Sequence, residues 1–167
     1  MRTVIHHADF VESVAASLQY ISYYHPADYI SHLAQAYERE ESVPAKDAMA
    51  QILENSRMCA EGRRPICQDT GIVNVFLTIG IEVRLQGFPG TIEDAVNMGV
   101  RKAYRDPSNP LRASIVGDPE FDRRNTGDNT PAVVHVDVVP GAELKLAIMA
   151  KGGGCENRSK YTMLTPA

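Results

Sequence analysis

The stretch Ile72–Val83, IVNVFLTIGIEV, is the best starting point for predicting the fold. It is rich in β-branched residues and too apolar to form a helix at the surface. A run of this kind, bounded by glycine and polar residues, is typical of a strand buried inside a sheet. We therefore expect Ile72–Val83 to form a buried strand, and the neighbouring segments are placed around it.

The segment before this strand has the residue spacing of helices. Apolar residues recur at helical intervals over Phe10–Ile21, Pro26 interrupts the pattern, and Ile30–Tyr37 resumes it. A third helix is expected after Pro44, and Gly62 is suited to its left-handed C-terminal cap. The first third of the chain is therefore predicted to be helical.

A capping box predicts the next helix. Thr91 stands three residues before Asp94, the spacing at which each side chain can bond the backbone amide of the other. We therefore expect a helix over Ile92–Tyr104. The segment Asp106–Pro110 ends it, because a proline cannot continue the helical hydrogen bonding.

Two apolar segments, AVVHVDVV and AELKLAIMA, occupy residues 132–139 and 142–150. They flank Pro140-Gly141, a pair that suits the middle of a type II turn, and so predict two antiparallel strands. The fold class expected from the whole pattern is α+β. N-terminal helices would be followed by a mainly antiparallel sheet with a covering helix.

The composition limits the classes of function. A chain of 167 residues fits one domain, and 17 Lys and Arg against 21 Asp and Glu give no argument for nucleic-acid binding. No apolar stretch is long enough to cross a bilayer, and the start lacks a secretory pattern, so we expect a cytoplasmic protein. The three cysteines, Cys59, Cys67 and Cys155, are too few for a disulfide scaffold.

The motif RPICQDTG, Arg64–Gly71, surrounds a cysteine with unusually polar neighbours. Cysteine normally packs as a small hydrophobe, yet Cys67 is followed directly by an amide, an acid and a hydroxyl. One interpretation is a tight turn in which Asp69 and Thr70 bond backbone amides while Cys67 packs inward. The other is a functional site presented at the start of a strand, and the residues alone leave both open.

The motif KGGGCENRSK, Lys151–Lys160, and Arg112 are further candidates. Successive glycines allow the backbone to approach a ligand closely and to present N–H groups to an anion. An exposed connection after a strand is the alternative. The guanidinium of Arg112, in NPLRAS, suits bidentate capture of a carboxylate, although a single arginine is most commonly a surface residue.

The remaining cysteines and histidines give weaker signals. Cys59 ends an amphipathic helix and is expected to be a packed thiol. His135 alternates with valines and is expected on the polar side of its strand. A structural zinc domain would require Cys67, Cys155 and His135 to converge, and nothing in their spacing requires it.

Four stretches together resemble the iron–sulfur-dependent (class I) fumarases. They occur in that family's order and with similar spacing: CAEGRRPICQDTGIV, NPLRAS, NTGDNTPA and KGGGCENRSK. The resemblance is to the family's N-terminal catalytic segment and extends over nearly the whole chain. Single-chain bacterial fumarate hydratases are the members it resembles most, with the L-tartrate dehydratase α subunit a near second.

This resemblance implies a cofactor and a reaction. Cys67 would be one of the three thiolates that hold a [4Fe–4S] cluster, leaving one iron open to act as a Lewis acid. The reaction implied is the reversible hydration of fumarate to (S)-malate. The family also implies a homodimer acting on a small dicarboxylate.

The resemblance also assigns residues to the substrate. Gln68 and Asp69 match positions that contact it, and Asp69 resembles the residue proposed as the acid near the iron-bound hydroxyl. Arg112 matches an arginine that binds a substrate carboxylate. Gly154 matches a glycine whose backbone approaches the substrate, so that the absent side chain makes room.

Several parts of the family pattern have no counterpart in this sequence. The other two cluster cysteines, the proposed base and further basic residues belong to later segments of the family. Cys155 stands where fumarases usually have serine and tartrate dehydratases can have cysteine, whereas the continuation ENRSK is similar to fumarases. We therefore expect residues 1–167 to be an incomplete N-terminal part, which alone neither retains a stable cluster nor turns over fumarate.

A non-catalytic module is the competing hypothesis. In it the folded chain serves as a binding or oligomerising unit with its anion-accepting glycine loop intact. In the expected α+β arrangement the motif loops meet at one edge of the sheet, and apolar surface awaiting the absent region is exposed there.

Overall fold

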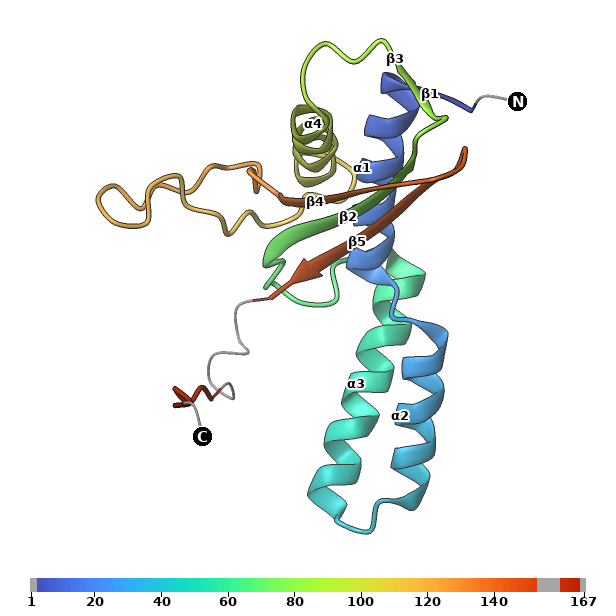
Figure 1. Ribbon diagram of the computed structural model, residues 1–167. Coiled ribbons are helices and arrows are strands. Elements are labelled where there is room, and N and C mark those ends of the chain that lie inside the picture. The colour runs from blue at the N-terminus through green and yellow to red at the C-terminus, as the bar shows by residue number, and fades with distance from the viewer. Residues whose placement is uncertain (1–2, 153–159, 166–167) are drawn as a thin grey trace.

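The computed structural model describes residues 3–152 and 160–165, arranged as Figure 1 shows. The helices are α1 (His7–Tyr23), α2 (Ala27–Arg39), α3 (Val43–Gly62) and α4 (Ile92–Tyr104). The strands are β1 (Val4–His6), β2 (Ile72–Gly80), β3 (Arg84–Gln86), β4 (Val133–Val139) and β5 (Leu144–Lys151). N-terminal helices followed by a sheet with a covering helix confirm the predicted α+β class.

The core lies between α1, α4 and one face of β2. The stripe predicted from the helical spacing of α1 is buried to 3% exposure or less at Phe10, Val14 and Leu18. On β2 every second side chain faces these helices, and the three that do so at its centre are Val73, Val75 and Leu77, none more than 2% exposed. Burying an aliphatic side chain of this size contributes roughly 1.5–3 kcal/mol to folding, so this layer is the main source of stability.

The main sheet is mixed, with strand order β4-β2-β5. Strand β2 pairs in parallel with β4, where Asn74 lies opposite Val133. It pairs in antiparallel with β5, where Asn74 lies opposite Met149. The sheet is therefore antiparallel along one of these two ladders and parallel along the other, rather than mainly antiparallel.

The strands on either side of Pro140-Gly141 run antiparallel, but they are not hydrogen-bonded neighbours. Strand β2 lies between them, and their connection crosses its end, where the Gly80 amide donates to the Glu143 carbonyl at 2.8 Å. The Glu82 amide donates to the Gly141 carbonyl at 3.0 Å. A side chain on Gly80 would overlap the Gly141 backbone, so the crossing needs glycine there. A turn signal is local and could not reveal that an earlier strand separates its two arms.

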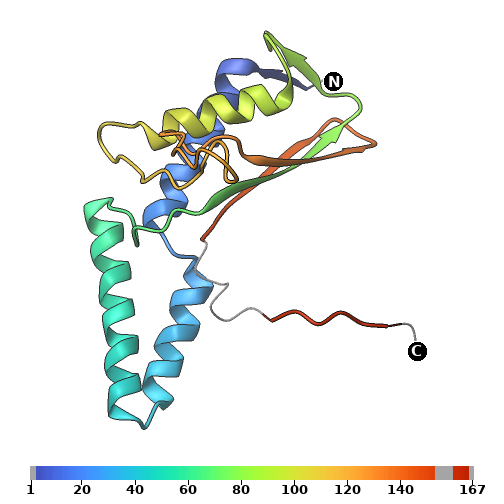
Figure 2. The same cartoon turned by 90° about the vertical axis from the view of Figure 1, so that its left-hand side faces the viewer.

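Helix α4 begins with the predicted capping box. The Asp94 amide donates to Thr91 Oγ1 at 3.1 Å, and the Thr91 amide donates to Asp94 Oδ2 at 2.9 Å. The helix crosses α1 closely at Gly99, where a Cβ atom would lie 2.6 Å from the Val14 Cβ. Helices α1 and α4 therefore pack against each other and against the same face of the sheet, as Figure 2 shows.

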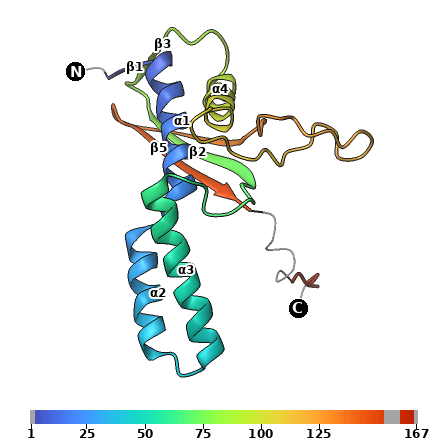
Figure 3. The same ribbon diagram turned by 180° about the vertical axis from the view of Figure 1, so that it is seen from behind.

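Helices α2 and α3 form an antiparallel hairpin that extends away from the body (Figures 1 and 3). Helix α2 has no buried residue, and α3 buries only Ser56 and Cys59. The left-handed residue that closes α3 is Arg63, with φ 47°, one position after the predicted Gly62. None of the helices in the described residues has the length and apolar character that crossing a membrane requires.

A second, small sheet was not predicted. Strands β1 and β3 pair in parallel over three residues each. The predicted strand Ile72–Val83 ends at Gly80, and a turn separates it from β3. Strands this short show no usable alternation of apolar and polar residues, and their pairing depends on the packed body.

The face of the main sheet opposite α1 and α4 is open in the described part of the chain. Four large apolar side chains on this face are 42–45% exposed: Ile72, Phe76, Val133 and Met149. We call these four residues the open sheet face. Exposed apolar surface at the sheet was expected, and here it covers a face rather than an edge.

Candidate active site

The loop between α3 and β2 carries the run Cys67–Gly71. Its first three residues, Cys67–Asp69, are exposed, whereas Gly71 at the start of β2 is buried. The Cys67 thiol lies 3.5 Å from the Asp69 carbonyl and donates to it. The interpretation in which Cys67 packs inward is therefore wrong, and the loop presents a thiol, an amide and a carboxylate outward.

Gly71 brings this loop against the start of the glycine run. Its φ of +64° is in the left-handed region, and a Cβ atom there would overlap the Lys151 carbonyl. One residue further along, a Cβ atom on Gly152 would lie 2.9 Å from Asp69 Oδ2. The Asp69 carboxylate therefore lies directly beside Gly152, where the glycine run begins.

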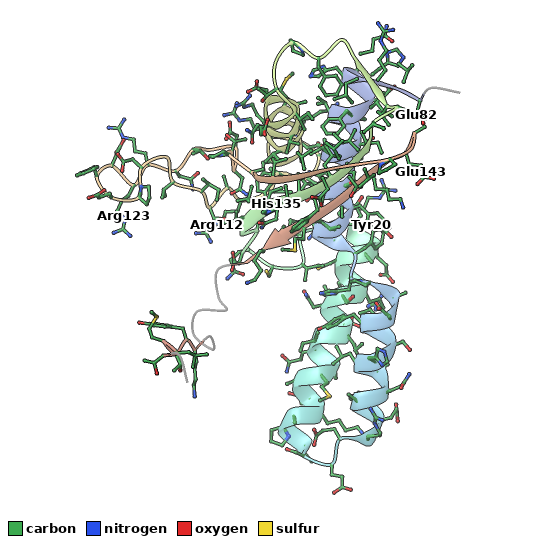
Figure 4. The ribbon with its side chains drawn as sticks, viewed as in Figure 1. Tyr20, Glu82, Arg112, Arg123, His135 and Glu143 are labelled. Atoms are coloured by element: carbon green, nitrogen blue, oxygen red, sulfur yellow. The ribbon has the colours of Figure 1, made fainter. Side chains whose placement is uncertain are left out.

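Arg112 is joined to the same loop through its backbone. Thr70 Oγ1 donates a hydrogen bond to the Arg112 carbonyl. The Arg112 side chain is exposed, and Figure 4 shows it where the segment after α4 passes the body, whereas Arg123 lies far out on the same segment. Three of the four motifs therefore meet here, at the end of β5 and the beginning of β2.

Two pockets flank the loop. The larger, of about 640 Å³, is lined by residues of both loop motifs and of the segment after Arg112: Asp69, Gly71, Ile72, Ser114, Ile115, Val116, Lys151 and Gly152. The smaller, of about 300 Å³, is mainly apolar and includes Cys67, Asp69 and Thr70. Asp69 lines both pockets, while Arg112 lines neither. Gly154 lies outside the described residues.

The fourth motif supplies a buried residue that sequence reasoning did not assign. Asn129, in NTGDNTPA, is 0% exposed and has a φ of 60°. Its Nδ2 donates to the Gly71 carbonyl at 2.9 Å, and its Oδ1 accepts from the Ser114 amide at 2.7 Å. The NTGDNTPA motif thus joins the loop at Gly71 to the segment that follows Arg112. The only signal in the sequence was an asparagine within a polar loop, which is ordinarily a surface residue.

Asp128, the preceding residue, is also buried and was not assigned. Burial raises the pKa of its carboxyl group, but hydrogen bonds from Arg101 and Thr130 and the charge of Arg101 outweigh burial and lower the pKa to about 2. Arg101 Nε lies 2.8 Å from Asp128 Oδ2, and Arg105 lies 3.5 Å from it. The ion pair of Asp128 with Arg101 attaches the NTGDNTPA motif to α4.

The described residues supply only part of an iron–sulfur site. Cys59 is 7% exposed, with its sulfur 3.6 Å from Asn55 Oδ1, so it is the packed thiol that was predicted. Cys67 has the donor chemistry and the exposure of a cluster ligand, and Cys155 lies outside the described residues. Within residues 3–152 and 160–165, no three His, Cys, Asp or Glu side chains gather as metal ligands. A cluster that needs three thiolates does not fit this part of the chain alone.

His135 lies beside the open sheet face, opposite Phe76, and not at this site. Its ring stacks on Phe76 with a centroid distance of 4.8 Å and an interplanar angle of 10°. It is exposed, as its alternation with valines predicted.

Comparison with known proteins gives one family. The family described as Fumarate hydratase (Fumerase) matches residues 11–167. A Methanocaldococcus jannaschii protein, provisionally named an L(+)-tartrate dehydratase subunit alpha, is 34% identical over 147 residues, which are 86% of this chain and 50% of that protein. The L(+)-tartrate dehydratase subunit alpha of Escherichia coli strain UTI89 is 31% identical over 161 residues, 93% of this chain and 50% of that subunit.

The match to a relative with a different name covers a smaller share of that relative's length. The anaerobic class I fumarate hydratase of Escherichia coli strain K12 is 30% identical over 142 residues, 85% of this chain and 25% of that enzyme. The chain thus spans about half the length of the tartrate dehydratase subunits and about a quarter of this fumarase. Since the family match includes all four motifs and nearly every described residue, the chain belongs to the fumarate hydratase (Fumerase) family.

Proposed function

We propose that this chain is the N-terminal part of a [4Fe–4S] hydro-lyase that adds water reversibly to fumarate, giving (S)-malate. The observation that carries the proposal is the convergence of three separate motifs at one place. The Asp69 carboxylate lies beside Gly152, and Thr70 is bonded to the Arg112 carbonyl. A thiol, a carboxylate and a guanidinium are three of the groups that such a reaction requires.

Each of these residues has a role suited to its chemistry. Cys67 would hold the cluster, which when bound supplies a Lewis acid for the hydroxyl of the substrate. Asp69 would move a proton at that hydroxyl oxygen, and the Gln68 amide would bond a substrate oxygen. Arg112 would bind a carboxylate of the diacid through two parallel hydrogen bonds.

The glycine run supports the same role. A substrate in the larger pocket, beside Asp69, would pass close to the backbone at Gly152. Gly154, whose family role is a close backbone approach to the substrate, belongs to the same run. A pocket of about 640 Å³ is more than large enough for a four-carbon diacid.

The remaining ligands would come from further polypeptide. One thiolate cannot hold a four-iron cluster against exchange, so two more cysteines and a base must be supplied from elsewhere. The open sheet face is a suitable surface for that association, because it exposes large apolar side chains. Complementation by a second segment or subunit is therefore part of the proposal.

Dehydration of L-tartrate is the second candidate activity. The relatives named as tartrate dehydratase alpha subunits match at 30–34% identity, and the class I fumarase matches at 30%. Both reactions remove or add water at a four-carbon dicarboxylate, so the groups assigned here serve either one.

Anaerobic reconstitution with iron and sulfide tests the proposal. We expect residues 1–167 alone to show no stoichiometric cluster absorbance and no malate dehydration. The full reading frame that contains this chain should bind a cluster and turn over malate or L-tartrate, and the ratio of the two rates identifies the substrate. Cys67→Ser should lose iron and activity together, whereas Asp69→Asn should keep iron and lose turnover.

Two results would overturn the proposal. A stoichiometric cluster with turnover in residues 1–167 alone would show that no complement is needed. Full iron content in the Cys67→Ser variant of the complete protein would show that this thiol is not a ligand. Cys59→Ser is the matched control, because that thiol is buried and should leave iron binding unchanged.

A further inference from the structure

The Asn129 side chain bonds the backbones of both the Cys67–Gly71 loop and the segment that follows Arg112. Its carboxamide donates to the Gly71 carbonyl at 2.9 Å and accepts from the amides of Ser114 at 2.7 Å and Ile115 at 3.2 Å. The Ser114 hydroxyl closes the arrangement by donating to the same Gly71 carbonyl at 3.2 Å. These bonds are shielded from water, because Asn129 is 0% exposed.

The backbone groups that Asn129 bonds lie close in sequence to the residues assigned to the substrate. Asp69 precedes Gly71 by two residues, and Arg112 precedes Ser114 by two residues. Thr70 Oγ1 adds a direct bond to the Arg112 carbonyl between these points. Asp69 and Arg112 are therefore each only two residues away from a backbone group that Asn129 bonds.

Tyr104 supports the same arrangement from α4. Its hydroxyl lies 3.4 Å from the Thr70 carbonyl. Burial raises the pKa of this hydroxyl, and its hydrogen bonds with Thr70 and Asn129 oppose that rise. Helix α4 thus also contacts the Cys67–Gly71 loop that Asn129 bonds.

Asparagine is the residue that this position requires. Its carboxamide both donates and accepts, as the Gly71 carbonyl and the Ser114 amide demand. Its φ of 60° is tolerated by asparagine better than by most residues. Aspartate has the same shape but cannot donate when ionised, and alanine reaches neither loop.

We infer that Asn129 is a positioning residue, which sets the placement of Asp69 relative to Arg112 by clamping the Cys67–Gly71 loop to the segment that follows Arg112. This inference rests on the proposed function for the roles of Asp69 and Arg112, but the clamp itself is a property of the described residues. Asn129 acts on the substrate only through these two loops.

Hydrogen exchange on residues 1–167 tests the clamp without requiring activity. Asn129→Asp should lower protection of the amides at the start of β2, residues 72–75, by about tenfold, because the buried hydrogen bond to the preceding Gly71 carbonyl is lost. Lowering the pH should restore that protection, since the protonated carboxyl group can again donate. Thr70→Val, which removes the second link and keeps the shape of the side chain, should have a similar effect if Asn129→Asp does not fold.

Asn125→Asp is the matched control. Asn125 lies in the same motif and its Nδ2 donates to the Ala113 carbonyl at 2.6 Å, but it makes no bond to the Cys67–Gly71 loop. Its replacement should leave protection of residues 72–75 unchanged. Equal loss of protection in the Asn125 and Asn129 variants would overturn the inference, because the loop would then respond to any damage to the motif.

Kinetics of the complete protein give the second readout. Asn129→Asp should lower kcat by roughly 10- to 100-fold, with a smaller change in KM and unchanged iron content, because the acid is misplaced rather than removed. Unchanged kcat would overturn the positioning role. If the wild-type protein has no hydro-lyase activity while exchange still couples the loops, the proposed function fails and the clamp stands.

Discussion

Asp128 keeps its negative charge in a place where burial alone would favour the neutral acid. Arg101 of α4 and Arg105, directly after the helix, hold it, and Thr130 completes its hydrogen bonds through its amide at 3.1 Å and its hydroxyl at 2.7 Å. A single carboxylate therefore ties the loop motif to the helix that covers the sheet. The next residue in the chain is Asn129, so this attachment lies directly beside the residue that bonds both loops.

Asp128→Asn should lower the free energy of unfolding by about 1–2 kcal/mol at neutral pH. The pKa in the folded state is about 2, below the ordinary value of 3.8, so the ionised group stabilises the fold fully above the ordinary value. That contribution is lost as the pH falls toward 2. Urea unfolding should thus show a gap between wild type and variant that narrows in acid.

The ion pair of Asp122 with Arg124 is the control for this experiment. It is nearly as close, at 3.0 Å, but both side chains are at least half exposed. Asp122→Asn should change stability by less than about 0.5 kcal/mol at any pH. A pH-independent gap for Asp128→Asn would contradict the role given to the charge.

At the scale of elements, the close approach of β2 to β5 depends on a glycine. Gly71 and Gly127 both have left-handed φ values, 64° and 75°. A Cβ atom at Gly71 would overlap the Lys151 carbonyl, whereas a Cβ atom at Gly127 would meet nothing within 4 Å. The two positions therefore separate the cost of the backbone angle from the cost of the contact.

Gly71→Ala should destabilise the fold by about 3 kcal/mol or more, since the angle and the overlap both oppose a side chain. Gly127→Ala should cost about 1 kcal/mol, for the angle alone. Denaturant unfolding of the two variants measures the difference. Equal losses would mean that the end of β5 moves freely away from the loop and that the site geometry is not fixed by this contact.

At the scale of the whole molecule, the body and the α2–α3 hairpin differ in how they are stabilised. The body buries a continuous core, while α2 buries no residue and α3 is buried only at Ser56 and Cys59, near the body. His25 Nδ1 lies 3.0 Å from Ser56 Oγ at this junction. The hairpin can therefore open while the body stays folded.

Native-state hydrogen exchange should show this difference directly. Amides of α2 should exchange with protection at least about 100-fold lower than those of Val73–Leu77, because opening the hairpin exposes little apolar surface. Helix α1, which is packed against the sheet, is the internal control and should exchange with the core. Identical protection in α2 and β2 would show that the molecule opens as one unit.

Much of the fold could be predicted from the sequence because its signals are local. The helical spacing of Phe10, Val14 and Leu18 identified the stripe that is buried, and Thr91 with Asp94 identified the start of α4. The glycine cap was misplaced by one residue, at Gly62 instead of Arg63. The roles of Cys67, Gln68, Asp69, Arg112 and Gly154 came from resemblance to a family and stay predictions.

The amino-acid sequence by itself determined the helices, the central strand and the family, whereas the exposure of Cys67–Asp69 was settled only by the structure. The tertiary structure decided that β2 separates β4 from β5, and that Asn129 joins partners 58 and 15 positions away in the chain. Periodicity reports which side of an element is buried. It does not report which distant backbone group a buried polar side chain will meet, because that depends on how all the elements pack together.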